Sequence, residues 1–475
     1  MNSATPAEAN HAHLPAWWWP GVVVATIVGL ILRVAAARGG YWTDEAWSVI
    51  YAAQARDAVG VFLRINHDNN HHLTSLWLQA IGMGAPPLLA RAPSIVFGTL
   101  AIPVAAILSR RASLCAGLAA AALFALSPVM VTFGSEARGY AGMILATLVL
   151  VWLAMRALEK PEWCTAPWWA ALAAALGTLS HLTMIAPVGL IAIWVFLDRR
   201  AALGAEKGLR EAARISGPPL LASVAVIAFV VVAARLSPTG MHVGGYAPFV
   251  FREWVSALDT LTAWTLGPRL GPAWVGPLVV GLAVAALLVR PPACLAPRAK
   301  LYAALIFGAP LAFVLLRVGN AGFARYYLCS AIGLLLLSAE LIGRGLAGKP
   351  GWRALAIAAL AAFTVLAGWR DAELIRLKRG DATQAIAQIK ARSPEGATVA
   401  LDAPRLEAML AVNAPQANLP VRIATGCAPA DYLLTAPPPG QGVPTSANHC
   451  GTPMHLLAST VSTPLSGEGW ALYAR

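Results

Sequence analysis

Residues 17–48 of the chain read WWWPGVVVATIVGLILRVAAARGGYWTDEAWS, an apolar run that ends shortly before two adjacent carboxylates, Asp44 and Glu45. The apolar part, from Trp17 to Ala37, is long enough for an α-helix to cross the hydrocarbon core of a bilayer. The tryptophans at its start are typical of anchors at the membrane surface. Paired carboxylates at such a surface are costly to keep unless they are solvated or used, so the stretch predicts a membrane helix followed by part of a site.

The composition of the whole chain agrees with this. Of its 475 residues, 58% are hydrophobic and 12% are charged, and the mean hydropathy is +0.65. These values are far from those of an ordinary soluble domain. The net charge of +13 suggests nucleic-acid binding, yet most Lys and Arg residues lie in short clusters between apolar runs, which is how cytoplasmic loops are marked. We therefore expect an integral membrane protein that binds no nucleic acid.

Apolar runs recur along the chain and predict about eleven transmembrane helices. Their approximate extents are 17–37, 92–109, 113–133, 139–157, 166–180, 182–197, 215–234, 272–289, 301–317, 327–343 and 353–369. Basic clusters fall on every second connection, which the positive-inside bias assigns to the cytoplasm. By parity, the outer face holds Asp44, Glu136, His181, the loop from Arg235 to Thr265, Arg325 and everything after Trp369. Two short helices meeting at His181 preserve this alternation, whereas one long helix would invert all that follows it.

Two further regions complete the predicted fold. Between the first two spans, apolar residues over 73–81 follow helical spacing, which predicts a helix too short to cross and lying in the membrane interface. After Trp369, strand-like runs (ATVALD, PVRIAT, DYLLTA, GWALYA) alternate with helix-like ones (TQAIAQIKA, RLEAMLAV). The expected fold class is an all-α polytopic membrane protein with interfacial helices in the first outer loop and a small C-terminal α/β domain in the periplasm. We expect the transmembrane domain over 1–370 and the soluble domain over 371–475.

Cysteines are sparse, and Cys427 and Cys450 both fall in the C-terminal domain. A disulfide suits a domain outside the cytoplasm. Two unpaired thiols remain the alternative, because sequence alone does not set the distance between them.

The outer face carries acidic and basic candidates for a site. Asp44 or Glu45 could act as a general base, or the pair could simply be solvated at a helix end. Glu136 and Arg138, at the start of a span, could form a structural ion pair. Arg138 could equally hold a phosphate with its guanidinium fork.

Histidines and aromatic residues lie on the same face. The stretch His67-Asp68-Asn69-Asn70-His71-His72 could bind sugar hydroxyls, phosphate or a metal, or it could be a solvated loop. His181 could be a ligand or a satisfied interior histidine. The run Arg325-Tyr326-Tyr327 could be part of a site or only an interfacial belt.

Taken in order, five motifs resemble a known family: YWTDEAWS, DNNHHLTSL, GSEARGYAGM, His181 between short spans, and ARYYL. The family is the polyprenyl-phosphate-sugar-dependent C-type glycosyltransferases, which include protein mannosyltransferase, aminoarabinose transferase and bacterial lipopolysaccharide transferases. The resemblance covers residues 17–345, and SEARGY is its most specific match. It implies an inverting transferase in a bacterial inner membrane. Such an enzyme moves a sugar from a polyprenyl-phosphate donor to a periplasmic acceptor, which is a protein, a lipid or a cell-envelope glycan.

The resemblance also assigns roles. Asp44 would be the base that removes a proton from the acceptor hydroxyl, and Glu45 would position the acceptor or assist. Arg138 and Arg325 would neutralise the departing polyprenyl phosphate, since fixed cations stabilise developing negative charge. The substrate-binding candidates are His71, His72, Glu136, Tyr140, His181 and Tyr326. The family pattern His-Pro-Pro-Leu is replaced here by Asn70-His71-His72-Leu73, which leaves the register between His71 and His72 open.

No cofactor is required by these motifs. Some C-type enzymes use a divalent cation, for which Asp44, Glu45 and His71 would be candidate ligands, although no spacing compels a metal. The alternative function is a lipid-linked-sugar flippase or a secondary transporter. Transporters tend to place charges near mid-bilayer in interrupted, repeated helices, whereas the charges here cluster at helix ends. A non-catalytic assembly subunit on the same scaffold would lose the acidic base, and Asp44 and Arg138 are both retained.

Overall fold

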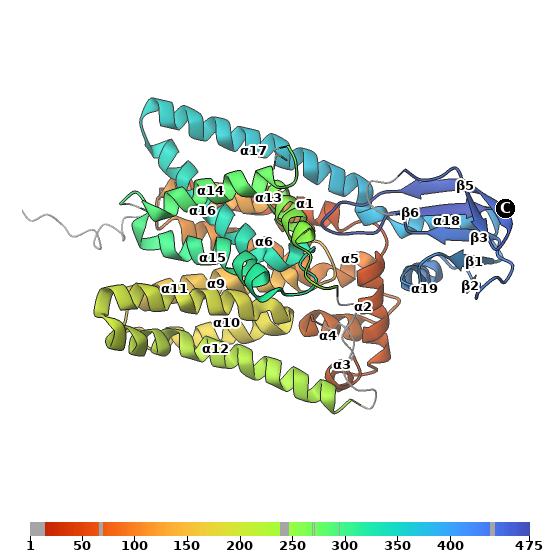
Figure 1. Cartoon of the computed structure of the whole chain (residues 1–475), viewed down its shortest axis with the longest axis horizontal. Coiled ribbons are helices and arrows are strands. Elements are labelled where there is room, and N and C mark those ends of the chain that lie inside the picture. The colour runs from red at the N-terminus through yellow and green to blue at the C-terminus, as the bar shows by residue number, and fades with distance from the viewer. Residues whose placement is uncertain are drawn as a thin grey trace, which may run out of the picture.

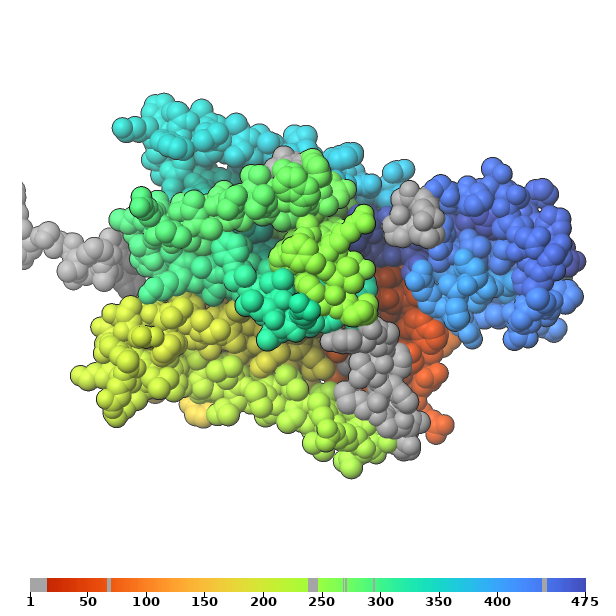
Figure 2. Space-filling model, in the orientation of Figure 1, coloured from red at the N-terminus to blue at the C-terminus, as the bar shows by residue number. Residues whose placement is uncertain are grey.

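The computed structural model describes residues 15–65, 70–237, 247–267, 269, 271–293, 295–437 and 442–475. Long helices form a bundle at one end of the molecule and a sheet domain forms the other end (Figure 1), where the space-filling view shows a distinct lobe (Figure 2). Eight helical segments of the described residues are long and apolar enough to cross a membrane. They are α1 (Trp18–Ala36), α6 (Ala92–Ser109), α9 (Tyr140–Glu159), η2 with α11 (Leu182–Leu203), α12 (Ala205–Arg235), α15 (Ala296–Leu316), η3 with α16 (Ala324–Ala347) and α17 with η4 (Pro350–Gly380). By these helices the chain is a multi-pass membrane protein.

The other predicted spans fold as shorter helices, so the described residues hold eight long apolar helices where about eleven transmembrane helices, some of them short, were expected. The shorter helices are α7 (Leu114–Leu126), α10 (Ala166–Ser180) and α14 (Val275–Val289). The span expected over 113–133 is divided because Ser127 is extended and Pro128 begins a new helix, α8 (Pro128–Phe133). Proline disfavours the helical conformation in the residue before it, which explains the break.

A long helix after α12 was not predicted. α13 (Phe251–Leu266) lies in the stretch expected to be an outer loop. Its buried residues recur with helical spacing, from Ala257 through Leu261 to Trp264. Charged residues such as Glu253 and Asp259 interrupt the apolar run, so a search for hydrophobic spans misses it.

His181 separates two helices. Of the two alternatives given by the sequence, the structure thus has two helices meeting at His181 rather than one long helix. α10 ends at Ser180, His181 is extended (φ −155°, ψ 125°), and the chain continues through η2 (Leu182–Met184) into α11 (Ile185–Leu203). Figure 1 shows α9, α10, α11 and α12 side by side.

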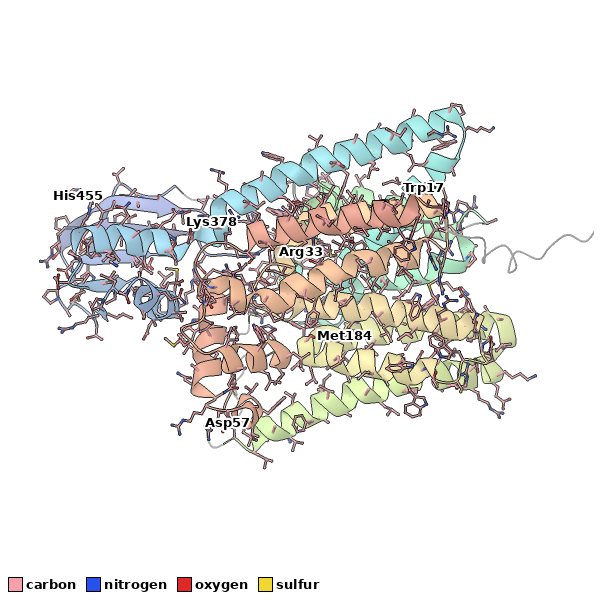
Figure 3. All side chains as sticks on the ribbon, turned by 180° about the vertical axis from the view of Figure 1, so that it is seen from behind. Trp17, Arg33, Asp57, Met184, Lys378 and His455 are labelled. Atoms are coloured by element: carbon pink, nitrogen blue, oxygen red, sulfur yellow. A yellow bond between two sulfur atoms is a disulfide. The ribbon has the colours of Figure 1, made fainter. Side chains whose placement is uncertain are left out.

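The basic connections meet at one end of the bundle. Arg111 after α6 forms an ion pair with Glu159 at the end of α9, at 2.7 Å. Lys300 near the start of α15 donates to the carbonyl of Leu197 in α11, at 3.2 Å. This is the end where Trp17 lies, and the sheet domain with His455 lies at the opposite end (Figure 3).

The chain between α1 and α6 folds into short helices across the end of the bundle that faces the sheet domain (Figure 1). They are α2 (Thr43–Gln54), α3 (Ala58–Leu63), α4 (His72–Ile81) and α5 (Pro87–Ala90). The helix predicted over 73–81 corresponds to α4. α2 follows the first membrane helix after a connection of six residues and carries the Asp-Glu pair.

The C-terminal domain has a six-stranded mixed sheet in the order β2-β1-β3-β6-β5-β4. The strands are β1 (Ala397–Leu401), β2 (Val421–Ile423), β3 (Tyr432–Thr435), β4 (Ser446–His449), β5 (Thr452–Thr460) and β6 (Trp470–Ala474). β1 pairs in parallel with β2 and β3, and the other pairs are antiparallel. Helices α18 (Ala382–Arg392) and α19 (Leu406–Gln416) share a core with one face of the sheet. The main helix α17 (Pro350–Leu377) runs past the boundary expected at residue 370.

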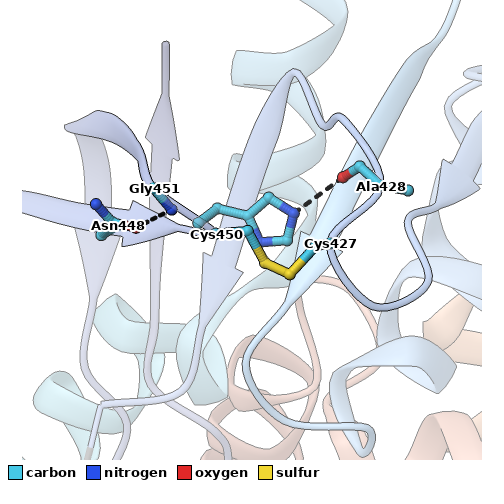
Figure 4. The surroundings of a disulfide bond; sticks show 6 residues. Cys427, Ala428, Asn448, Cys450 and Gly451 are labelled. Carbon is cyan, nitrogen blue, oxygen red and sulfur yellow. Dashed lines mark hydrogen bonds between the residues drawn. A yellow bond between two sulfur atoms is a disulfide. The ribbon is translucent and has the colours of Figure 1, made fainter.

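A disulfide joins Cys427 to Cys450 (Figure 4), which answers the question that the sequence left open. Cys450 lies in the turn between β4 and β5, and Cys427 follows β2. The bond therefore ties the edge hairpin of the sheet to the loop that leads into β3.

Candidate functional site

One face of α2 lines a cavity of about 550 Å³ between the helical bundle and the C-terminal domain. Asp44, Trp47, Ser48 and Tyr51 are spaced at i, i+3, i+4 and i+7, so they share one side of the helix. The remaining wall comes from distant segments of the chain: Ile65, Asn70, His71, Ser75, Arg138, Asn320, Phe323, Arg325, Tyr326, Pro404 and Arg405.

Two arginines converge on Asp44 inside this cavity. Arg138 donates through Nη1 to Asp44 Oδ2, and Arg325 Nη1 lies 3.3 Å from the same oxygen. Arg138 precedes α9 and Arg325 belongs to η3 (Ala324–Tyr327), so three remote stretches meet here. Burial alone would lower the pKa of Arg138, but the neighbouring acidic groups, Tyr140 and Asp44 first, raise it overall. The carboxylate thus faces two permanent cations.

Glu45 points away from the cavity. It is fully buried and forms a two-pronged ion pair with Arg91, at 2.9 Å (Nε–Oε1) and 2.5 Å (Nη2–Oε2). Its Oε1 also accepts from the backbone N–H of Ala137, at 2.7 Å. Burial favours the neutral acid, but the Arg91 guanidinium outweighs it and lowers the pKa of Glu45. Glu45 therefore links α2 to the residue before Arg138 rather than facing a substrate.

Of the two adjacent histidines, His71 lines the cavity and His72 does not. The His71 ring lies 5.0 Å from that of His181, which stacks 4.5 Å from Tyr140. Burial first, and then the Arg138 charge, lower the pKa values of His71 and His181 well below the usual range, so both rings are neutral at neutral pH. His72 instead stacks on Phe62 at 5.2 Å, and burial lowers its pKa to about 4.

Glu136 lies outside the cavity wall. It is buried, and its Oε2 accepts from the hydroxyl of Ser466 at 2.7 Å. Burial raises the pKa of Glu136, with Arg138 and Arg379 opposing the shift. This residue contacts the C-terminal domain.

The structure therefore sorts the predicted site residues into three groups. Asp44, His71, Arg138, Arg325 and Tyr326 line the cavity, Tyr140 and His181 pack behind His71, and Glu45, His72 and Glu136 do not line it. Within the stretch 67–72, residues 67–69 lie outside the described residues.

Other residues of the site were not predicted. Arg91 is a single basic residue between Pro87 and an apolar run. A lone charge in an otherwise apolar stretch is the signal that could have predicted a buried ion pair here. The C-terminal domain contributes Pro404 and Arg405 to the cavity, and Arg405 pairs with Glu468 at 2.8 Å. No sequence motif links these residues to Asp44, because the contact exists only after the two domains pack.

The residues suggested as metal ligands do not fit a metal ion. Within the part of the chain that the structure describes, no group of three or more His, Cys, Asp or Glu residues could hold one. Both oxygens of Glu45 are already engaged by Arg91, and one of them also by the Ala137 N–H.

Comparison with known proteins gives structural matches only. No family model matches the chain, and no curated protein matches it. The structure is similar to that of the Archaeoglobus fulgidus oligosaccharyltransferase in the apo form, with a TM-score of 0.46 and 13% identity, over 86% of this chain and 64% of that one. It is also similar to AglB of the same organism in complex with an inhibitory peptide and a dolichol-phosphate, with a TM-score of 0.43 and 13% identity, over 89% of this chain and 69% of that one. A third match is ArnT from Cupriavidus metallidurans in the apo state, with a TM-score of 0.41 and 13% identity, over 96% of this chain and 97% of that one. The chain thus spans 64% of the length of the first of these structures. AglB and ArnT are glycosyltransferases of the C-type fold, the class that the sequence motifs resemble.

Proposed function

We propose that this protein is a membrane glycosyltransferase that moves a sugar, with inversion, from a polyprenyl-phosphate donor to an acceptor in the periplasm. The observation that carries the proposal is the convergence of Asp44, Arg138 and Arg325 in one cavity. A carboxylate beside two guanidinium groups is the set of charges that this displacement needs. The charges lie at one end of the bundle rather than in interrupted, repeated helices, which favours a transferase over a transporter.

The reaction can be written with these residues. The oxygen of the acceptor hydroxyl attacks the anomeric carbon of the donor sugar, and the bond from that carbon to the phosphate oxygen breaks. The phosphate leaves with the electron pair, and Asp44 takes the proton of the hydroxyl. Arg138 and Arg325 stabilise the additional charge on the phosphate without reorganising, because both guanidinium groups are already in place.

Arg138 and Arg325 can contact the donor phosphate and Asp44 at the same time. A guanidinium has five N–H donors, so each arginine can bind phosphate oxygens while still contacting the carboxylate. The neutral ring of His71, on the same wall, can exchange hydrogen bonds with a sugar hydroxyl without adding another cation.

Binding of the lipid phosphate tests the donor assignment. With full-length protein in lipid nanodiscs, we expect undecaprenyl phosphate to bind wild type and Asp44→Asn, and to bind Arg138→Gln at least tenfold more weakly. Arg210→Gln is the matched control, because Arg210 lies on the exposed surface of α12. Equal binding by wild type and Arg138→Gln would refute the phosphate role.

Glycan analysis in cells tests the reaction. Envelope glycans from cells lacking the gene should miss one sugar, as measured by mass spectrometry. A chromosomal Asp44→Asn substitution should reproduce that loss while the protein remains in the membrane. Wild-type glycans in the Asp44→Asn strain would exclude Asp44 as the base.

A further inference from the structure

Two aromatic residues lie beside the carboxylate on the cavity face of α2. Trp47 and Tyr51 both line the cavity, and their rings stack with centroids 5.4 Å apart and an interplanar angle of 26°. At a helical rise of about 1.5 Å per residue, they lie about 5 Å and about 10 Å along the helix from Asp44. The aromatic wall thus begins next to the proposed base and leads away from it.

The wall is held in place from behind. On the opposite side of α2, Ala46 and Val49 share a buried cluster with Ala408 and Val412 of α19, and Trp47 packs partly against the same cluster. The helix therefore has one face fixed against the C-terminal domain and one face towards the cavity. Packing of this kind sets the rotation of α2, and with it the direction of both rings.

Polar groups surround the aromatic pair. Ser48 lies between the two aromatic residues on the same helix face, and Asn70 and Asn320 line the cavity. Arg405 comes from the C-terminal domain, where Glu468 holds its guanidinium. A hydrocarbon chain in this space would press against these polar side chains and deprive them of water, which is unfavourable.

Building on the proposed function, we propose that the acceptor is a carbohydrate chain whose terminal sugar lies against Trp47, with the reacting hydroxyl at Asp44 and the next sugar against Tyr51. A sugar ring has a face of C–H groups, which packs on an aromatic ring, and an edge of hydroxyls, which needs hydrogen-bonding partners. The aromatic pair supplies the first surface, and Asn70 and Arg405 supply polar groups for the second; the Ser48 hydroxyl, which donates to the Asp44 carbonyl, can still accept.

Ligand-observed saturation-transfer NMR tests this assignment with the full-length protein in nanodiscs. The probe is the water-soluble oligosaccharide fraction released by mild acid from the envelope of the gene-deletion strain, in which the acceptor is unmodified. A tryptic peptide fraction of the same envelope is the competing probe. We expect saturation transfer from the wild-type protein to the oligosaccharides. Trp47→Ala and Tyr51→Ala should bind them at least tenfold more weakly than wild type, and Trp47→Phe should bind them within about threefold of wild type. Trp169→Ala is the control, since Trp169 is exposed on α10.

The outcomes separate this inference from the proposed function. Undecaprenyl phosphate binding, measured in parallel, shows whether each variant is folded and whether the donor site is intact. If Trp47→Ala binds the oligosaccharides as wild type does, or if only the peptides show saturation transfer, the carbohydrate assignment is overturned while the donor site stands. If oligosaccharides bind and undecaprenyl phosphate does not, the proposed function fails instead.

Discussion

Adjacent carboxylates in this chain have opposite environments. The side chain of Asp44 is 32% exposed and lies in the cavity, whereas that of Glu45 is fully buried with Arg91. Arg91 also donates to the backbone carbonyls of Ala37, Gly39 and Gly40. The Glu45–Arg91 pair thereby holds the end of the first membrane helix, the start of α2 and the residue before Arg138 in one arrangement. We infer that Glu45 positions the site rather than touching the substrate.

Removing one member of the Glu45–Arg91 pair should lower the stability of the fold. Glu45→Gln leaves the Arg91 charge buried without its partner, so we expect a loss of about 3–5 kcal/mol of stability, measured as a lower Tm in detergent. Glu206→Gln is the matched control, because its pair with Arg210 is exposed and contributes little. A similar small change in Tm for both variants would contradict this role. Because the pKa of Glu45 is lowered in the folded state, its contribution is present above the usual carboxyl pKa and is lost as the pH falls below it.

The buried histidines predict that the stability of the protein also depends on pH. Because they are neutral in the folded protein, acid should destabilise it. His71, His72 and His181 have lowered pKa values in the folded protein, so the unfolded chain binds protons first, near pH 6.5. Stability therefore falls as the pH falls, and each histidine should contribute about 1 kcal/mol of that loss between pH 6.5 and 5.5. Thermal melts of His181→Asn should show a shallower pH dependence than wild type. An equally steep dependence would show that His181 is already charged when folded.

At the scale of elements, a sharp turn joins α17 to the C-terminal domain. Arg379 in this turn has φ 58° and is buried. It donates to the carbonyls of Ala36 and Thr132, at 2.6 and 2.9 Å, and to the hydroxyls of Ser135 and Ser466, at 2.7 and 3.1 Å. Left-handed backbone is unfavourable for a residue with a side chain, so these four bonds offset the cost. The turn fixes the C-terminal domain above the stretch that carries Arg138.

The hydroxyl of Ser466 connects Arg379 to Glu136, which makes it a precise test of this docking. Ser466→Ala removes a donor to a buried carboxylate, so we expect a cost of about 1–3 kcal/mol. Hydrogen exchange in β6 and in the segment before it should become faster. Ser446→Ala, at an exposed position of β4, is the control and should leave exchange unchanged. Unchanged exchange in Ser466→Ala would mean that the docking does not depend on this network.

At the scale of the whole molecule, charge and disulfide chemistry indicate the same orientation. The basic connections lie at the end of the bundle opposite the sheet domain, and the sheet domain contains the Cys427–Cys450 bond. Basic loops face the cytoplasm, and disulfides persist in oxidising compartments. Both features agree with the proposal that the acceptor is modified in the periplasm.

The Cys427–Cys450 bond of the structure should also form in cells if the C-terminal domain lies in the periplasm, as proposed. The double substitution Cys427→Ser with Cys450→Ser should cost the C-terminal domain about 3 kcal/mol, given the loop that the bond closes. Hydrogen exchange of the sheet under non-reducing conditions measures this loss, and Cys115→Ser is the control.

A reporter joined after residue 400 should be active on the periplasmic side. Cytoplasmic activity of that reporter would overturn both the orientation and the shared site.

Much of the fold was decided locally, by the sequence itself. Apolar runs predicted the membrane helices because a helix needs a continuous apolar length to cross a bilayer. The strand-like runs of the C-terminal domain became β1, β2, β3 and β6, because alternating or short apolar runs fit a sheet. The charged residues at helix ends also pointed to Asp44, Arg138 and Arg325 as neighbours, since the alternation of the helices puts them on one face.

Tertiary structure decided the rest. Successive helical residues differ by about 100° in direction, so long-range contacts of α2, its packing on α19 and the Glu45–Arg91 pair among them, set which of Asp44 and Glu45 faces the cavity. The same holds for His71 and His72 at the start of α4. Arg405 reaches the cavity only because the C-terminal domain docks on the bundle. The sequence by itself determined the helices and their candidate charges, whereas the rotation of each helix and the contacts between domains depend on long-range packing that no local pattern encodes.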